Sequence, residues 1–364
     1  MLGELEISHP IMVGAGPWSR NAASIQKCID YGASAVVTET ITLDAHPTLC
    51  PHIYAQDQHI FNTKLFSDLH LEQWEREIKR IDKKESKLIC SIWGSSASEV
   101  SYLASKVSQI GADGIELSLF SPIGTRNRMI VDQSEKIIEF IAAIRHAVHI
   151  PVIVKLSYEI GTDPFVTKQI YDSGIRVVSA IDGLKGLSDV NVETQSVKMP
   201  TYGGFTGDSI RPMALATTAA LKQNTSLQIC SVGGISHYTH VLGYLMLGAD
   251  AVQLASVIQT HGFEIITKIK GELSRWLEVR HYSLEDIRGS ALSSLLPFED
   301  LKPQPLIAAI SDCECLPECQ KCTAACLYDA ISYGASLTIE PSLCVGCGIC
   351  VDLCPCHKLF LVWQ

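Results

Sequence analysis

The sequence lacks the features that mark secreted, membrane-spanning or nucleic-acid-binding chains. It holds no uncharged apolar run of roughly eighteen residues or more, so no transmembrane helix is expected. Its first residues, MLGELEISHP, contain no basic stretch followed by an apolar core, which argues against a signal peptide. Acidic residues outnumber basic ones by 39 to 29, and no basic stripe is present. These absences predict a cytoplasmic protein that binds neither membranes nor nucleic acids.

Proline is also scarce, with 15 residues in 364, and a small group of prolines falls in the segment LPFEDLKPQP at residues 296–305. Such a segment is typical of a linker between domains. Hydrophobic residues make up 47% of the chain, which is enough to form a large buried core and a second small domain. We therefore expect one domain at residues 1–300 and another at residues 306–364.

Short apolar segments alternate with helical patterns through the first domain. Amphipathic patterns at 71–81, 135–148 and 240–249 lie between some of them. Apolar strands separated by such helices indicate a parallel sheet buried on both faces. Eight strands over this length favour an α/β fold, the (β/α)8 TIM barrel, with a doubly wound open sheet as the alternative. The eight segments are 11–15, 35–39, 88–93, 114–119, 151–156, 176–181, 227–232 and 250–255.

Cysteine spacing distinguishes the second domain. Residues 313–364 hold ten of the fourteen cysteines. One group reads C-x2-C-x2-C-x3-C-P, a spacing typical of bacterial ferredoxins, in which three thiolates hold one 4Fe–4S cluster and the fourth binds the other. This predicts a small α+β ferredoxin-like domain with two clusters. The crossover rule assigns Cys315, Cys319, Cys322 and Cys354 to one cluster, and Cys344, Cys347, Cys350 and Cys326 to the other.

The first cysteine group is less regular than the second, which leaves alternatives open. Three residues separate Cys315 from Cys319, so Cys313 is an alternative ligand to Cys315. Paired C-x2-C motifs also bind zinc, although zinc ribbons lack the closely spaced third and fourth cysteines followed by proline. A disulfide scaffold is disfavoured in a large chain without a secretion signal.

The active site of a TIM barrel is formed by residues at the C-terminal ends of its strands. Glycines follow the first and seventh segments, at 14–16 and 233–234, and such turns bind phosphate through backbone N–H groups. On a chain with iron–sulfur motifs they favour a flavin phosphate. Lys155 ends the fifth segment, where it is either a solvated rim residue or a group that stabilises negative charge on a reduced flavin. Ser118 and Ser121 follow the fourth, as a turn or as a proton donor.

The chain resembles the dihydroorotate dehydrogenase family along almost its whole length. The resemblance is greatest to dihydropyrimidine dehydrogenases, in the part where an FMN barrel precedes two 4Fe–4S clusters. The most specific shared segment is TYGG-x-x-G-x-x-IRP-x-AL, at residues 201–215. The other shared segments, in order, are HPIMVGAGPW, GASAVVTETITL, GADGIELSLFSP, PVIVKL, SVGGI and GADAVQLAS.

The resemblance implies FMN as the cofactor and gives roles to particular residues. Ser121 takes the place of the acid/base, and Asn62 matches a substrate-binding asparagine. Lys155 faces the flavin ring. The other flavin contacts that the resemblance implies are Ala15, Gly16, Thr40 and Ser91 near the ring and Gly204, Gly207, Gly233, Gly234, Ala255 and Ser256 around the phosphate.

Several positions depart from the family pattern. Glu39 stands where relatives have a flavin-contacting lysine, and Lys64 replaces a substrate-contacting acid. Ser118 replaces an asparagine, and Asp182-Gly183 replaces Asn-Thr. Unmatched buried polar groups cost roughly 1–3 kcal/mol each, so these changes penalise a pyrimidine. The hypothesis is that the substrate is neither uracil nor orotate.

The resemblance implies a flavin- and iron–sulfur-dependent oxidoreductase acting on a C=C or CH–CH bond of a small molecule. The chain has no further glycine-rich dinucleotide motif, so a separate reductase subunit or a ferredoxin is expected as electron donor. The family suggests a homodimer or hetero-oligomer. Two alternatives remain: an electron-transfer subunit whose barrel is catalytically idle, and a zinc protein without redox chemistry.

Overall fold

The computed structural model divides into two compact units, Met1–Ser294 and Leu295–Gln364. Within the described part of the chain, no helix is long and apolar enough to cross a membrane. Ser121, Cys313 and Cys315 lie outside the described residues. The described residues are 1–45, 51–56, 59–119, 134–301, 305–311, 319, 321–334 and 336–363.

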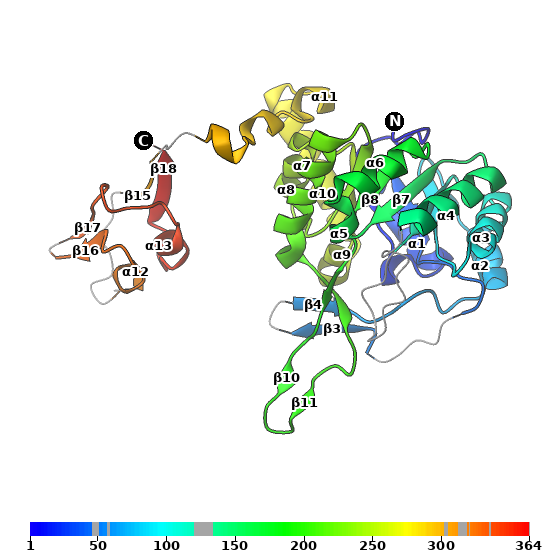
Figure 1. Ribbon diagram of the computed structural model, residues 1–364, viewed down its shortest axis with the longest axis horizontal. Helices are drawn as coiled ribbons and strands as arrows, with labels where there is room; N and C mark the ends of the chain where they lie inside the picture. Colours follow the sequence, from blue (N-terminus) through cyan, green and yellow to red (C-terminus); the bar gives the residue numbers. More distant parts are fainter. Residues whose placement is uncertain are drawn as a thin grey trace. The chain divides into compact units, whose positions relative to one another are not determined.

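A closed barrel of eight parallel strands forms the first unit (Figure 1). Each of the eight apolar segments contains one strand, which confirms the TIM barrel and rules out the open sheet. The order around the barrel is β1-β14-β13-β8-β7-β6-β5-β2, and β2 closes on β1. The strands are β1 (Ile11–Val13), β2 (Ala35–Val37), β5 (Lys87–Ile92), β6 (Gly114–Ser118), β7 (Val152–Leu156), β8 (Val177–Ala180), β13 (Gln228–Val232) and β14 (Ala251–Leu254).

Helices alternate with the strands, and several begin at strong capping residues. The Asp163 carboxylate, for example, accepts the N–H groups of Phe165 and Val166, and Pro164 takes the first helical position. The predicted helical patterns at 71–81, 135–148 and 240–249 correspond to α2, α4 and α8. The helices are α1 (Ala22–Asp30), α2 (Leu71–Ile78), α3 (Ala97–Gln109), α4 (Ser134–Ala147), α5 (Tyr158–Gly161), α6 (Pro164–Asp172), α7 (Arg211–Asn224), α8 (Tyr238–Met246), α9 (Ser256–His261), α10 (Glu264–Arg280) and α11 (Leu284–Ile287).

Short 3-10 turns complete the helical elements. They are η1 (Pro17–Ser19), η2 (Asp208–Ile210), η3 (Leu292–Ser294) and η4 (Phe298–Asp300).

Strand residues alternate between two apolar layers. Val36 packs outward against the helices, whereas its neighbours Ala35 and Val37 belong to a cluster inside the barrel. Leu2 and Leu5, joined by mutual backbone hydrogen bonds, belong to the same inner cluster. The inner cluster, which we call the plug, fills the end of the barrel where the strands begin. It comprises Leu2, Leu5, Met12, Ala35, Val37, Ile89, Ile153, Val177, Cys230 and Ala251.

A small antiparallel sheet stands apart from the barrel strands, in the order β3-β4-β12-β9. Its strands are β3 (Ile53–Gln56), β4 (His59–Asn62), β9 (Leu184–Gly186) and β12 (Gly203–Thr206). The Phe61 ring on β4 packs 5.3 Å from that of Phe205, and Asn62 pairs with Gly204 across the strands. This sheet was not expected from the sequence.

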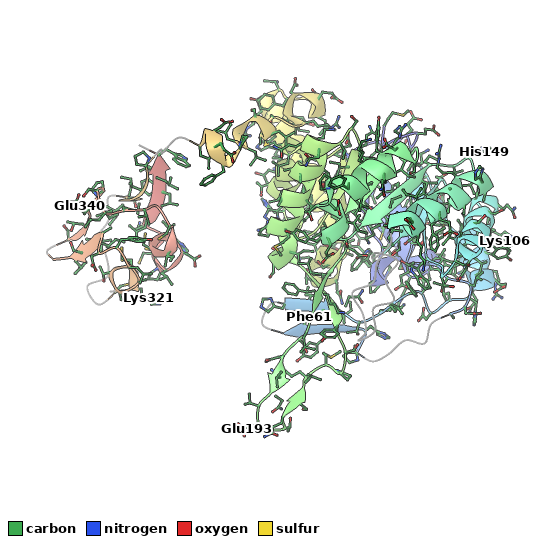
Figure 2. The ribbon with its side chains drawn as sticks, viewed as in Figure 1. Phe61, Lys106, His149, Glu193, Lys321 and Glu340 are labelled. Atoms are coloured by element: carbon green, nitrogen blue, oxygen red, sulfur yellow. The ribbon has the colours of Figure 1, made fainter. Side chains whose placement is uncertain are left out.

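Beyond β9 the chain forms a hairpin, β10 (Val190–Asn191) with β11 (Ser196–Val197), whose far end carries Glu193 (Figure 2).

Among its described residues, the second unit contains two strand pairs and two short α-helices, besides the turn η4. β15 (Leu306–Ile310) pairs with β18 (Leu359–Trp363), and β16 (Ile331–Tyr333) pairs with β17 (Leu337–Ile339). The helices are α12 (Lys321–Ala324) and α13 (Ile349–Asp352). Three cysteines are part of its core, so thiols supply core volume in this small unit. The core comprises Ala308, Cys322, Ile331, Leu337, Cys350, Cys354 and Leu359.

Candidate active site and thiol cavity

The polar residues of the site continue the inward-facing rows of the strands. Lys155 lies two residues after Ile153, which belongs to the plug, and Gln253 lies two residues after Ala251. Glu39 likewise follows Val37 by two positions. Because side chains alternate along a strand, apolar residues fill one end of the barrel interior and polar residues occupy the other. This polar end is where the strands of a TIM barrel carry their active sites.

Two adjoining cavities open at this end. We call them together the site cavity. The residues that line both are Ala15, Gly16, Pro17, Asn62, Lys155, Asp182, Gly183 and Thr206.

Most of the residues singled out from the sequence line this cavity. Ser91 does not: it is fully buried, and its hydroxyl lies 2.9 Å from that of Thr40 on the cavity wall. The lining includes Ala15, Gly16, Glu39, Thr40, Asn62, Lys64, Ser118, Lys155, Asp182, Gly183, Gly204, Gly207, Gly233, Gly234, Ala255 and Ser256.

Lys155 belongs to a buried charge network. Its Nζ lies 3.7 Å from Asp182 Oδ1 and 3.9 Å from Glu116 Oε1. Burial acts to lower the pKa of Lys155, but the Asp182 and Glu116 carboxylates outweigh it and raise that pKa. The lysine is 9% exposed, so it is not the solvated rim residue considered above. A cation held in this way faces the cavity permanently charged.

Glu116 anchors this network from inside the barrel. It is fully buried, and its Oε2 accepts hydrogen bonds of 2.8 Å from Ser179 Oγ and from Gln253 Nε2. Glu116 and Gln253 were not among the site residues expected from the sequence. The signal was available, because a carboxylate within the apolar run GIELSL and an amide within DAVQLA both need buried partners.

A second ion pair lines the other side of the cavity. Lys64 Nζ lies 2.9 Å from Glu39 Oε2, and both side chains are nine-tenths or more buried. The Asn62 amide fixes the Lys64 backbone, accepting its N–H at 3.0 Å and donating to its carbonyl at 3.4 Å. Burial raises the pKa of Glu39 to about 7, against the opposing effect of Lys64. Glu39 and Lys64, which both depart from the family pattern, therefore form an ion pair with each other.

Glycines shape the cavity wall next to β13 and β14. Gly234 has a φ of +63°, and a Cβ there would lie 2.6 Å from Arg211 Cβ. At Gly233 a Cβ would lie 2.8 Å from Ala214 Cβ. α9 begins at Ser256, where the first N–H groups of a helix have no partner within the helix. A close backbone turn with exposed N–H groups fits a phosphate, so these residues fit the phosphate end of FMN.

Cysteines of the second unit line a small cavity. Backbone N–H groups donate to two of the predicted ligands, Ala308 to Cys344 Sγ at 3.3 Å and Lys358 to Cys354 Sγ at 3.4 Å. Among the described residues, no three His, Cys, Asp or Glu side chains are gathered around one metal ion. The thiols that line the cavity are Cys322, Cys326, Cys344, Cys347 and Cys350.

This cavity brings together all four cysteines assigned to the second cluster, and five thiols in a small unit fit an iron–sulfur cluster. Of the first cluster's ligands, Cys319, Cys322 and Cys354 are described and Cys315 is not.

Comparison with known proteins agrees with this architecture. The family model for dihydroorotate dehydrogenase matches residues 2–277, and that for a 4Fe-4S binding domain matches residues 337–357. The chain is 27% identical over 296 residues to the catalytic subunit of dihydroorotate dehydrogenase B (NAD(+)) of Thermoplasma volcanium, covering 80% of this chain and 97% of that protein.

A second relative extends into the cysteine-rich unit. Subunit PreA of the NAD-dependent dihydropyrimidine dehydrogenase of Escherichia coli is 24% identical over 346 residues, covering 89% of this chain and 84% of the relative. Among solved structures, dihydroorotate dehydrogenase of Eimeria tenella in complex with ferulenol aligns with a TM-score of 0.68. That alignment has 17% identity and covers 80% of this chain and 87% of that one. It supports the fold alone.

The barrel topology and the family match over most of the chain agree with each other. The chain thus belongs to the dihydroorotate dehydrogenase family of flavin-dependent oxidoreductases, with a C-terminal 4Fe–4S binding domain.

Proposed function

We propose that this chain is the catalytic subunit of an oxidoreductase that exchanges a hydride with a C=C or CH–CH bond of a small cyclic or activated substrate. The observation that carries the proposal is the site cavity, which gathers the residues assigned to cofactor and substrate at the polar end of one barrel. An idle barrel has no need of a buried lysine held charged by two carboxylates at that position.

The cofactor of this proposal is FMN. Gly204, Gly207, Gly233, Gly234, Ala255 and Ser256 would hold its phosphate, and Ala15, Gly16, Glu39, Thr40 and Lys155 would lie along its ring, with Ser91 supporting Thr40. When bound, FMN supplies hydride transfer and accepts electrons one at a time. Lys155 supplies a fixed positive charge to the site, which stabilises negative charge on a reduced ring.

Proton transfer is assigned to Ser121, which lies outside the described residues. A serine hydroxyl is a weak acid, so a water or side-chain relay must assist it. We expect Ser121→Ala to slow turnover by about 10²–10⁴, as is typical of acid/base groups. Flavin reduction by a chemical donor should stay intact in this variant. Turnover at the wild-type rate would remove Ser121 from the mechanism.

Electrons reach the barrel, in this proposal, through two 4Fe–4S clusters. Cys344, Cys347, Cys350 and Cys326 would bind one, and their grouping around a single cavity supports this assignment. Cys315, Cys319, Cys322 and Cys354 would bind the other.

The proposed electron donor is a separate flavin- and NAD(P)H-dependent reductase subunit or a free ferredoxin. Two of the relatives above are subunits of NAD-dependent enzymes, whereas this sequence has no further glycine-rich dinucleotide motif. We therefore propose that the chain works as a homodimer or in a hetero-oligomer.

The substrate is proposed to differ from uracil and orotate. Asn62, whose family counterpart binds substrate, uses its amide on both sides to hold the Lys64 backbone. The remaining substrate-side positions are Lys64, Ser118, Asp182 and Gly183, all of which line the cavity. Polar groups that no longer match a pyrimidine edge cost roughly 1–3 kcal/mol each.

An anaerobic titration tests the proposal. The protein is purified without oxygen, reduced with a chemical donor, and mixed with uracil, thymine, orotate or other activated alkenes while flavin absorbance is followed. We expect flavin and iron–sulfur bands, slow reoxidation by the pyrimidines, and fast reoxidation by another activated alkene. Rapid reoxidation by a pyrimidine would contradict the altered pocket, and a protein without bound flavin would contradict the catalytic assignment.

A further inference from the structure

The turn that follows β13 contains two buried N–H groups without an acceptor. Gly234 and Ile235 are both buried, and both line the site cavity. Among the described residues, neither of their backbone N–H groups donates a hydrogen bond. Buried N–H groups in native proteins are nearly always paired, so these two indicate an acceptor that a bound ligand brings.

The carbonyl groups of the same turn are already paired, with side chains from two helices. The Tyr244 hydroxyl donates to the Gly233 carbonyl at 2.5 Å. Arg211 Nη1 donates to the Gly234 carbonyl at 3.0 Å. Tyr244 is fully buried on α8, and Arg211 is the first residue of α7. These two helices lie against each other on the outside of the barrel (Figure 1), so both carbonyls point toward the helices.

The planarity of the peptide group then fixes the direction of the N–H groups. In a trans peptide the C=O and N–H bonds point in opposite directions. The Gly233 carbonyl shares its peptide with the Gly234 N–H, and the Gly234 carbonyl shares its peptide with the Ile235 N–H. Because both carbonyls point toward α7 and α8, both N–H groups point to the side of the turn that faces the cavity.

The N–H group of the next residue is held by a histidine. Ser236 N–H donates to His240 Nδ1 at 3.2 Å, and Arg211 Nη1 lies 3.3 Å from the same nitrogen. A nitrogen that accepts from two donors carries no proton, and burial together with the Arg211 charge lowers the pKa of His240. Asp208 Oδ2, 3.6 Å from Arg211 Nη1, balances the guanidinium charge. Arg211 is thus fixed on two further sides, and the free N–H groups end at Ile235.

We propose that Tyr244 and Arg211 are positioning residues for the phosphate of the cofactor. By holding the two carbonyls of the turn away from the cavity, they leave the Gly234 and Ile235 N–H groups as donors to phosphate oxygens. Neither Tyr244 nor Arg211 is among the described residues that line the cavity, so both act through the backbone. This inference rests on the proposed function, because it concerns the FMN that the cavity is proposed to hold.

The test compares FMN with riboflavin, which has the same ring system and lacks the phosphate. Flavin is removed from the anaerobically purified protein, and the binding of each compound is measured by the quenching of flavin fluorescence. The titrations are made in ~1 M salt, where the Debye length is about 3 Å, so that a distant charge contributes little. We expect the wild-type protein to bind FMN at least about tenfold more tightly than riboflavin.

Tyr244→Phe removes one hydroxyl group and changes no charge. The Gly233 carbonyl loses its partner in this variant, and the turn is no longer held with its N–H groups toward the cavity. We expect the affinity for FMN to fall about tenfold, and the affinity for riboflavin to stay within about twofold of the wild-type value. Tyr238→Phe is the matched control, since Tyr238 lies on the same helix and takes no part in the hydrogen bonds of the turn.

Arg211→Met should likewise weaken FMN about tenfold and spare riboflavin. Its control is Arg288→Met, because the Arg288 side chain is 29% exposed, as is that of Arg211, and pairs with Asp250 at 3.8 Å. Asp250 directly precedes Ala251, a residue of the plug, so this pair lies at the other end of the barrel. Arg288→Met should leave the affinities for both flavins unchanged.

Hydrogen exchange in the wild-type protein supplies a measurement that needs no variant. Exchange of the backbone amides is followed by mass spectrometry in peptides that span Gly234 and Ile235. We expect FMN to slow the exchange of these amides and riboflavin to leave it faster, because only FMN brings an acceptor for them.

Four results would overturn the inference. They are equal binding of FMN and riboflavin by the wild-type protein, unchanged FMN affinity in Tyr244→Phe or Arg211→Met, a parallel loss of both flavins in these variants, and equal protection of the turn by the two flavins. Each leaves the proposed function standing if the wild-type protein binds flavin and passes electrons to an activated alkene. Failure of the wild-type protein to bind either flavin would instead contradict the proposed function. If a variant does not fold, the hydrogen exchange of the wild-type protein still decides the inference.

Discussion

At the scale of single residues, the site is dominated by charges that are buried yet paired. Lys155 is bracketed by Asp182 and Glu116, and Lys64 is held against Glu39. Such pairs add little net stability, because desolvation offsets much of their attraction. Removing only one partner of such a pair, however, lowers the stability of the folded protein, because the other charge is left buried without a counterion.

Lys155→Met tests this directly. Without the ammonium group, the fully buried Glu116 loses its counterion and keeps only two hydrogen bonds. We expect the free energy of unfolding to fall by about 3 kcal/mol, measured by chemical denaturation. Lys168→Met is the control, since Lys168 pairs with Asp172 at 2.6 Å on the surface and should contribute less than about 1 kcal/mol. Equal effects of the two variants would contradict the buried network.

The raised pKa of Glu39 predicts that the free energy of unfolding depends on pH. Its pKa is about 7 in the folded protein and 4.5 ordinarily, so the folded state binds more protons between these values. The stabilisation is complete below about pH 4.5 and is lost as the pH rises to about 7. We expect a loss of about 3 kcal/mol across this window. Denaturation of Glu39→Gln at several pH values should show a flatter profile than the wild-type protein; an identical profile would show that Glu39 does not titrate there.

The sequence singled out residues that line one cavity in the structure, but it did not indicate how their side chains pair. Lys155 stood out because a lysine ending an apolar strand needs an anion nearby. Glu39 and Lys64 were both recognised as departures, yet nothing in the sequence places residues on different loops 2.9 Å apart. The role of Glu116 was not predicted, because a single carboxylate within an apolar run does not by itself distinguish a site residue from the rest of the strand.

At the scale of secondary structure elements, the turn after β13 combines tight geometry with a proposed function. Gly234→Ala would place a Cβ 2.6 Å from Arg211 Cβ in a left-handed backbone conformation. We expect the free energy of unfolding to fall by about 2 kcal/mol and the flavin content of the purified protein to drop. Flavin content is measured by absorbance after release, and an undiminished content would argue against phosphate binding at this turn.

A matched control lies in α10. Gly271 has no other atom within 4 Å of the position of a Cβ, and it occupies a helix interior. Gly271→Ala should raise the free energy of unfolding by about 0.5–1 kcal/mol and leave the flavin content unchanged.

The barrel strands could be predicted from sequence because each is a short apolar run followed by a helical pattern. The sheet of β3, β4, β12 and β9 could not, because its partners come from separate loops. Asn62 and Gly204 are register partners across this sheet although they are far apart in sequence. Their pairing depends on the closed barrel, which brings the two loops to the same end.

At the scale of the whole molecule, the proposed cluster ligands of the second unit can be compared with a cysteine that is assigned to neither cluster. Cys347→Ser removes a ligand from the thiol cavity, and we expect the iron and sulfide content to fall by about half, because one of two clusters is lost. Cys356→Ser removes a cysteine that is assigned to neither cluster and should keep the full content. Chemical analysis of both variants checks the outcome, and zinc in place of iron would exclude the iron–sulfur reading altogether.

The cysteine spacing predicted a ferredoxin-like unit, and the match to a 4Fe-4S binding domain at residues 337–357 confirms an iron–sulfur region. The number of clusters stays a prediction. Spacing alone also left Cys313 and Cys315 as alternatives, since a sequence gives the order of ligands and not their distances.

Among the described residues, the plug fills the barrel interior at the end where the strands begin. The Leu5 side chain lies next to Gly114, the first residue of β6, and Gly3 lies next to Val177, the first residue of β8. Apolar side chains therefore fill that end of the barrel. The site cavity opens at the opposite end of the barrel. FMN bound in this cavity, as proposed, would share this opening with the substrate, so we expect a bound ligand to slow the release of the cofactor.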